Sequence, residues 1–260
     1  MLLRIEDLDS PRVKRGSDRE AMEVLGWLGM DWDEGPMYQS AEMGVYREAM
    51  ERLARAGVAY ASGLSRGEIE AAGTDMTGGT GDSVGASGAS APQEGSHEVA
   101  FPASLRPAVI GSRRFDEEAN NWRLVVEAGG AGVKFEDVFA GRQSFDVARI
   151  VGDFLVWTKR GVPAYQLAVV VDDARQGVTQ VVRGDDLLDS TARQMLVARA
   201  LGLEAWKPRF THVPLVRGVD GKRLAKRHGD TRIGSYRGGG VRAERIIGLI
   251  AAWSGVLPRG

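Results

Sequence analysis

The stretch from Val162 to Gly229 constrains the fold of this chain more than any other part, because its segments follow the order of half a nucleotide-binding α/β domain. An apolar run over 167–171 precedes a β-branched segment, V-T-Q-V-V, that ends at Arg183-Gly184. A helical pattern through Met195, a strand-like F-T-H-V-P-L-V and a basic loop, G-K-R-L-A-K-R-H-G, complete the order. The sequence therefore predicts an α/β fold with a ligand site at the carboxyl ends of its strands.

Composition and charge narrow the class of protein further. Cysteine is absent, which excludes disulfides and thiolate metal sites and fits a cytoplasmic protein. No run approaches the ~18 apolar residues of a membrane span. Residues 205–260 hold twelve Lys or Arg against three Asp or Glu, whereas residues 1–204 carry a balance of −10. A basic face of this kind suits a phosphate backbone or a triphosphate, and the alternative is a solvated basic tail.

Helix-start signals divide the chain into further elements. We expect these starts at a capping box over Ser17–Glu20 for a helix to about Gly29, at Ser40 for a helix to Gly57, at Ser65 with Glu68, and at Ser190 and Thr191 for a helix to Leu201. A terminal helix is predicted from about Ala243 to Trp253, with its apolar side chains along one side. The apolar run over 167–171 fits a buried strand or a buried helix, and its periodicity does not decide between them.

The remaining segments are strand-like or lack an apolar pattern. Met1–Ile5 is predicted to be a strand that places Glu6, Asp7 and Asp9 at its carboxyl end. Residues 123–127, 133–139 and 151–158 have alternating or apolar patterns of strand length. The Gly-, Ser- and Thr-rich stretch over 73–97 is expected to be a flexible surface insertion.

Three ordered blocks carry a resemblance to a known family. They are L-R-I-E-D-L-D at 3–9 followed by Pro11-Arg12, Y-Q-L-A-V-V-V-D-D at 165–173, and R-L-A-K-R at 223–227. In this respect the chain resembles the glutamyl class I aminoacyl-tRNA synthetases, and within them the short branch of glutamyl-Q tRNA(Asp) synthetases. The resemblance implies a Rossmann-like catalytic domain with an inserted subdomain and no anticodon-binding domain, and it implies a helix over 167–171.

The same resemblance implies how the domain is divided. Residues 1–60 and 151–235 correspond to the two nucleotide-binding halves, and the second half contains the K-M-S-K-S-type loop. Residues 61–150 correspond to the inserted subdomain that approaches the acceptor end of tRNA. Residues 236–260 correspond to a C-terminal helical segment.

Five residues match functional positions of the family. Glu6 matches the residue that binds the ammonium group of glutamate, and Tyr165 and Arg183 match its other glutamate-binding residues. An arginine at a strand end also suits a carboxylate on chemical grounds, because its fork is bidentate. Lys226 and Arg223 match the two lysines of the ATP-binding loop, where positive charge stabilises the departing pyrophosphate.

The implied reaction activates glutamate with ATP and magnesium and then transfers it to queuosine in the anticodon of tRNA(Asp). The protein is expected to be a cytoplasmic monomer. One alternative is a truncated glutamyl-tRNA synthetase that charges tRNA(Glu). A second is a non-catalytic protein that binds tRNA through its basic C-terminal face.

Two features depart from the family pattern. The sequence starts just before R-I-E-D, so we expect the first βα unit, with its H-I-G-H-type motif, to be absent. The positions that correspond to the four ligands of the family's zinc knuckle are Ser62, Leu64, Phe101 and Leu105. None of these side chains is a useful zinc ligand. The sequence therefore predicts no zinc, and a knuckle held by packing.

Overall fold

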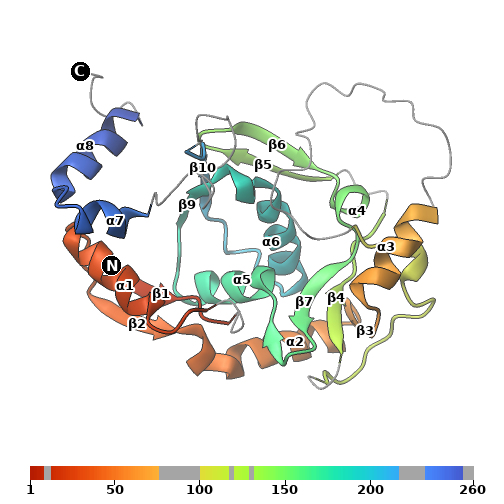
Figure 1. Ribbon diagram of the computed structural model, residues 1–260. Coiled ribbons are helices and arrows are strands. Elements are labelled where there is room, and N and C mark those ends of the chain that lie inside the picture. The colour runs from red at the N-terminus through yellow and green to blue at the C-terminus, as the bar shows by residue number, and fades with distance from the viewer. Residues whose placement is uncertain (9–12, 76–99, 117–119, 129–131, 217–231, 254–260) are drawn as a thin grey trace. The chain divides into compact units, whose positions relative to one another are not determined.

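The computed structural model describes residues 1–8, 13–75, 100–116, 120–128, 132–216 and 232–253 (Figure 1). The chain divides into two compact units, each with its own strands and helices. The first unit consists of Met1–Glu42 and Val216–Gly260, and the second of Met43–Leu215. No helix in the described ranges is both long enough and apolar enough to cross a membrane.

The first unit contains a parallel pair of strands, β1 (Leu2–Ile5) and β2 (Glu34–Tyr38). β1 is the strand predicted at the start of the chain. β2 was not predicted, because E-G-P-M-Y contains a glycine and a proline, which usually interrupt strands. Gly35 is needed here: its φ is +100°, and a β-carbon would collide with the carbonyl oxygen of Leu3.

The helix α1 (Ser17–Trp27) begins differently from the prediction. Its N-cap is Gly16, with a left-handed φ of 85°, and no side chain caps the helix. The predicted capping box is therefore wrong, because Gly16 turns the chain one residue earlier and places Ser17 inside the first turn. Asp18 in that turn instead accepts a hydrogen bond of 2.9 Å from the hydroxyl of Tyr38 on β2.

Two helices from the C-terminal part complete the first unit. They are α7 (Ile233–Gly238) and α8 (Ala243–Trp253). The bounds of α8 agree with the prediction. Its apolar side chains Ile247, Ile250 and Trp253 are 44%, 50% and 53% exposed, so the described residues do not bury its apolar side.

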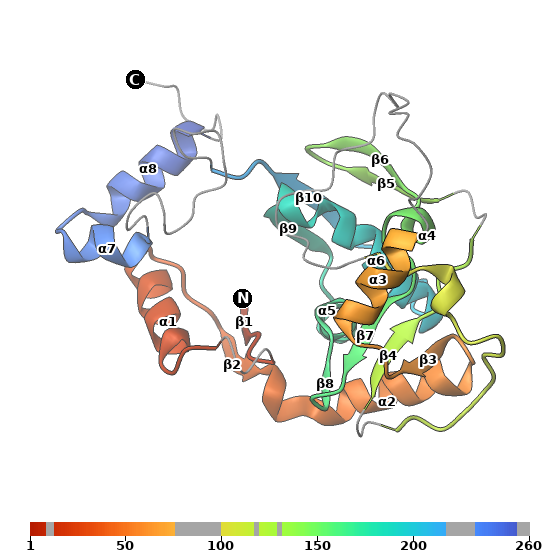
Figure 2. The same cartoon turned by 45° about the vertical axis from the view of Figure 1, so that its right-hand side comes forward.

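The second unit contains two four-stranded sheets. The first has the order β6–β5–β10–β9, in which β5, β10 and β9 run parallel and β6 is antiparallel. Its strands are β5 (Val133–Asp137), β6 (Gly141–Phe145), β9 (Gln180–Gly184) and β10 (Arg209–Val213). The second sheet is antiparallel, with the order β3–β4–β7–β8 (Figure 2). Its strands are β3 (Ala59–Ser62), β4 (Asn121–Leu124), β7 (Phe154–Thr158) and β8 (Val162–Pro163).

The helices and short turns of the second unit connect and cover these sheets. They are α2 (Met43–Arg55), α3 (Arg66–Asp75), η2 (Ala103–Leu105), α4 (Val147–Ile150), α5 (Tyr165–Arg175), η3 (Asp185–Leu187) and α6 (Leu188–Ala200). The short turn η1 (Gln39–Glu42) belongs to the first unit. α3 has the predicted start, since Ser65 and Glu68 bond each other's backbone N–H groups as a capping box does.

α5 settles the ambiguity over 167–171 in favour of a helix. It packs against α2, α6 and β7, and every residue from Gln166 to Asp172 is buried. Because this part of the helix is covered on several sides, its residues 167–171 are all apolar and show no helical stripe.

α6 corrects the prediction that Ser190 and Thr191 cap a helix. The short turn η3 leads directly into α6 at Leu188, so both residues lie within the helix and are buried. No side chain caps its N-terminus. The predicted strand over 151–158 is also shorter than expected: Asp146 caps α4 by accepting from the N–H of Arg149, and β7 begins only at Phe154.

The knuckle region is built around an apolar cluster. Tyr60, Ile69 and Phe101 form its buried centre, and Leu64 and Leu105 pack against them. Three of the four positions that correspond to zinc ligands thus contribute to one cluster. The residues present do not fit a zinc ion, because serine, leucine and phenylalanine offer no suitable donor set.

A buried carboxylate lies next to this cluster. Asp153, which is 1% exposed, accepts hydrogen bonds from the hydroxyl of Tyr60 (2.7 Å), from Arg106 (2.6 and 2.8 Å) and from the N–H of Val126 (2.8 Å). These bonds connect β3, the loop before β4 and the residues that follow it. A buried charge with this many donors is satisfied, so it links these segments rather than weakening them.

If the apolar cluster holds this region together without a metal, its central residue should contribute strongly to stability. Phe101→Ala should lower the free energy of unfolding by about 3–5 kcal/mol, because it removes the centre of the cluster. Val109→Ala is the control: Val109 is 79% exposed in the same region, so the change should stay within about 0.5 kcal/mol. Urea denaturation measures both. A chelator should leave the wild-type midpoint unchanged, and a chelator-sensitive midpoint or an equivalent of bound zinc would contradict this account.

Candidate functional site

The structure brings together two of the predicted glutamate-binding residues, Tyr165 and Arg183. Tyr165 is the first residue of α5, and Arg183 lies near the carboxyl end of β9. Their side chains are hydrogen bonded. Tyr165 is 42% exposed, so the pair lies at the surface of the second unit and remains accessible to a ligand.

Two of the three guanidinium nitrogens of Arg183 are bonded inside the protein. Nε donates to Nε2 of His212 at 3.0 Å. Nη2 donates to Oγ1 of Thr191 at 2.8 Å and to Oε1 of Gln194 at 2.9 Å. Among the described residues, Nη1 is therefore the nitrogen left for the hydroxyl of Tyr165 and for a ligand. The sequence analysis considered a carboxylate bound by two nitrogens of the arginine. The geometry instead leaves a ligand to approach Arg183 end-on, at Nη1.

His212 connects Arg183 to a buried carboxylate. Its Nδ1 lies 2.6 Å from Oδ2 of Asp137, and neither side chain is exposed to solvent. Asp137 also accepts from the backbone N–H groups of Phe139 (3.0 Å) and Ala140 (2.8 Å). The three charged or polar residues, Asp137, His212 and Arg183, come from the adjacent parallel strands β5, β10 and β9.

Burial and hydrogen bonding act in opposite directions on the two ionised groups. Burial would raise the pKa of Asp137, but hydrogen bonds from Ala140, His212 and Phe139 hold it below its ordinary value, so the group is ionised. Burial lowers the pKa of Arg183, although the interaction with Tyr165 partly offsets this. Arginine retains its proton despite such a shift, so the site presents a positive charge.

Sequence reasoning does not single out His212, Asp137, Thr191 or Gln194. The sequence nevertheless contains a signal for two of them. Asp137 ends the run V-K-F-E-D, and His212 lies in the strand-like segment F-T-H-V-P-L-V, which becomes the neighbouring strand of the same sheet. Polar residues near the carboxyl ends of neighbouring parallel strands meet at one edge. Recognising that β5 and β10 are neighbours required the topology.

The other predicted site residues are not part of this arrangement. Glu6 belongs to the first unit, where it follows β1 and pairs with Arg4 at 3.0 Å. Next to it, Asp7 accepts a hydrogen bond of 2.9 Å from the N–H of Ser40. Lys226 and Arg223 lie outside the described residues.

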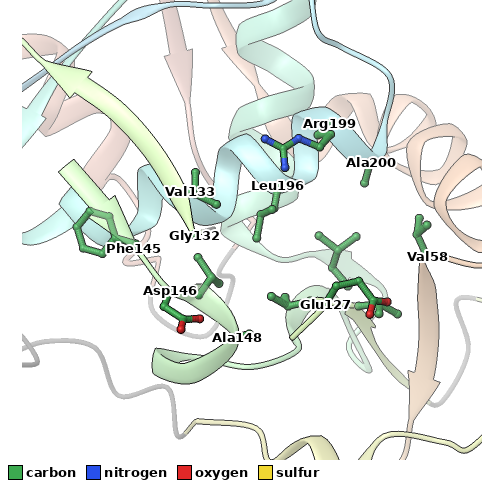
Figure 3. Close-up of a pocket in the computed structure, with 14 residues that line it drawn as sticks. Val58, Glu127, Gly132, Val133, Phe145, Asp146, Ala148, Leu196, Arg199 and Ala200 are labelled. Carbon is green, nitrogen blue, oxygen red and sulfur yellow. The ribbon is translucent and has the colours of Figure 1, made fainter. Parts of the chain in front are cut away.

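A cavity of about 410 Å³ lies elsewhere in the second unit, beside the C-terminal half of α6 (Figure 3). Its walls are mostly apolar and include Val133, Phe145 and Leu196, with Glu127 and Arg199 among the polar residues. Of the predicted site residues that the structure describes, Glu6, Tyr165 and Arg183, none lines it. The cavity is therefore separate from the pair formed by Tyr165 and Arg183.

The sequence is similar to proteins of known name along almost its whole length. A glutamyl-Q tRNA(Asp) synthetase of Rhodopirellula baltica is 39% identical, over 99% of this chain and 76% of that protein. The corresponding protein of Symbiobacterium thermophilum is 40% identical, over 98% and 76%. A glutamate–tRNA ligase of Geobacter sulfurreducens is 36% identical, over 97% of this chain but 50% of that protein.

The fold is similar to that of a solved structure. The crystal structure of glutamate-tRNA synthetase from Elizabethkingia anophelis has a TM-score of 0.64 and 25% sequence identity, and the match covers 88% of this chain and 46% of that one. The predicted α/β fold class is confirmed. Residues 1–254 match the family of class I tRNA synthetases (E and Q), catalytic domain. The chain therefore belongs to the class I tRNA synthetases of the E and Q type.

Proposed function

We propose that this protein activates glutamate with ATP and transfers it to queuosine in the anticodon of tRNA(Asp). The observation that carries the proposal is the similarity, at 39–40% identity over nearly the whole chain, to proteins named glutamyl-Q tRNA(Asp) synthetase. The chain spans about three quarters of the length of these relatives. The pairing of Tyr165 with Arg183 on the structure supports a site for an acidic ligand.

The proposed reaction has two steps. An oxygen of the glutamate α-carboxylate attacks the α-phosphorus of ATP, supplied with magnesium as substrate, and pyrophosphate leaves. A hydroxyl of queuosine then attacks the carbonyl carbon of glutamyl-adenylate, loses its proton, and AMP leaves. Such transfers need little covalent help from a protein, because placement of the reactants and positive charge supply most of the acceleration.

The residues named from the sequence divide these tasks. Glu6 binds the ammonium group of glutamate, and Tyr165 with Arg183 binds the side-chain carboxylate. In this arrangement Nη1 of Arg183 and the hydroxyl of Tyr165 face the carboxylate together, with charge-assisted hydrogen bonds that are stronger than neutral ones. Lys226, with Arg223 beside it in the loop, contacts the β- and γ-phosphates, where negative charge increases as pyrophosphate leaves.

A second candidate is charging of tRNA(Glu). The observation that favours it is the 36% identity to a glutamate–tRNA ligase over 97% of this chain. The identity to the glutamyl-Q relatives is higher, at 39–40%, so charging of tRNA(Glu) ranks second. A third candidate is tRNA binding without catalysis, through the basic C-terminal part.

Glutamate-dependent exchange between ATP and labelled pyrophosphate tests the first step. Exchange should occur with this chain, or with a form extended to an in-frame upstream start, and Arg183→Ala should lower kcat/KM for glutamate at least about 100-fold because it removes the cation from a partly buried site. Arg209→Ala on the same sheet is the matched control, since Arg209 is exposed on β10. Absence of exchange in both wild-type forms, with salt-dependent tRNA binding retained, would favour the non-catalytic candidate.

Transfer of labelled glutamate to tRNA tests the acceptor. Queuosine-containing tRNA(Asp) should become labelled, whereas the same tRNA with guanosine at that position should not, because it lacks the accepting hydroxyl. Labelling of tRNA(Glu) at its 3′ end would instead establish the second candidate. Digestion of the labelled tRNA and identification of the modified nucleoside distinguishes the two outcomes.

A further inference from the structure

The residues around Arg183 form a chain of hydrogen bonds across three adjacent strands. His212 lies directly opposite Arg183 in the parallel pairing of β10 with β9. Asp137 ends β5 on the other side of β10. His212 and Asp137 are 0% and 1% exposed, so solvent does not compete for these bonds.

Asp137 is held in one orientation by the backbone. Its Oδ1 accepts from the N–H groups of Phe139 and Ala140, and the N–H of His212 contacts both carboxylate oxygens at 3.1 and 3.2 Å. Oδ2 therefore faces Nδ1 of the imidazole at 2.6 Å. An ionised carboxylate only accepts, so Nδ1 carries a proton and donates it.

The other side of the imidazole faces a donor that always has its proton. Nε of Arg183 carries one hydrogen and points at Nε2 of His212 at 3.0 Å. Nε2 must therefore present a lone pair, and His212 is the neutral tautomer with its proton on Nδ1. Thr191 lies 3.2 Å from the same Nε2 and accepts from Nη2 of Arg183, so it is compatible with this assignment.

We propose that His212, oriented by Asp137, is a positioning residue that fixes the guanidinium of Arg183 and leaves Nη1 for the carboxylate of glutamate. The inference rests on the proposed function, because it assumes that Arg183 binds glutamate. His212 does not touch the substrate. Without it, Nε of Arg183 loses its acceptor in a buried place and the guanidinium is free to rotate about its side-chain bonds.

A proton on Nε2 of His212 would reverse the arrangement. The imidazole faces Asp137 from β5, Arg183 from β9 and the hydroxyl of Thr191 from α6. Such a proton would point at the N–H of Arg183, so only the tautomer with its proton on Nδ1 can accept from Arg183.

Three variants separate positioning from general damage. His212→Ala removes the acceptor and should raise the KM for glutamate about 10- to 100-fold, with the KM for ATP within about 3-fold of wild type. His212→Gln places an amide oxygen in reach of Arg183 Nε, so it should restore most of the affinity for glutamate. Thr211→Ala is the control, because neighbouring residues of a strand point to opposite faces.

Asp137→Asn tests the role of the carboxylate. Because the backbone donors occupy Oδ1, the amide nitrogen of the variant must take the place of Oδ2, opposite Nδ1–H. The imidazole should then move its proton to Nε2 and oppose Arg183. Selective ¹⁵N labelling of histidine detects this change directly: the wild type should show His212 protonated at Nδ1, and the variant should show it protonated at Nε2 with a raised KM for glutamate.

The outcomes that contradict the inference differ from those that contradict the proposed function. Normal exchange with an unchanged KM for glutamate in His212→Ala, equal loss in the Ala and Gln variants, or a wild-type His212 protonated at Nε2 would each overturn the inference alone. A wild-type protein without exchange contradicts the proposed function and, with it, the role of Arg183 in binding glutamate. The NMR signals then still show whether His212 is protonated at Nδ1, as its hydrogen bonds to Asp137 and Arg183 require.

Discussion

The bond between the buried carboxylate of Asp137 and the imidazole of His212 is the constraint on which the site depends. It joins β5 to β10 at the residue of β10 that pairs with Arg183 of β9. It also determines which nitrogen of His212 accepts the hydrogen bond from Arg183. That choice in turn determines which nitrogen of Arg183 remains for a ligand. The guanidinium of Arg183 is thereby held in one orientation, although arginine is a flexible side chain. A binding site requires such rigid orientation of its binding groups.

The region around Phe101 is held by other contacts. In place of a metal, the cluster of Tyr60, Phe101 and their apolar neighbours packs against the buried carboxylate of Asp153 and its donors. Both parts of the second unit therefore contain an aspartate that is buried and accepts several hydrogen bonds. Removing one partner of such a group costs more than the bond itself, because the charge is left buried.

Sequence patterns predicted the elements whose signals are local. The capping box at Ser65 and Glu68 and the bounds of α8 follow from side chains within one turn or from a helical stripe. The side-chain cap predicted for α1 was wrong, because Gly16 is its N-cap, and the start of α6 was predicted too late, because the turn η3 leads into the helix at Leu188.

The site shows the same division between local and long-range signals. Tyr165 and Arg183 came from a resemblance in motif, and the structure pairs them. His212 and Asp137 could not be assigned, because they meet Arg183 through strand neighbours 29 and 75 residues apart in sequence. Which strands are neighbours is a property of the topology, and short patterns do not encode it. The functional roles of Glu6, Lys226 and Arg223 stay predictions.

The most direct test of the account is a crystal structure with a non-hydrolysable analogue of glutamyl-adenylate. The account predicts that the side-chain carboxylate of the analogue lies within hydrogen-bonding distance of Nη1 of Arg183 and of the hydroxyl of Tyr165. It also predicts that the bonds from Arg183 Nε to His212 and from His212 to Asp137 remain in place. A carboxylate bound elsewhere, or an Arg183 that leaves His212 to form a fork around the ligand, would contradict it.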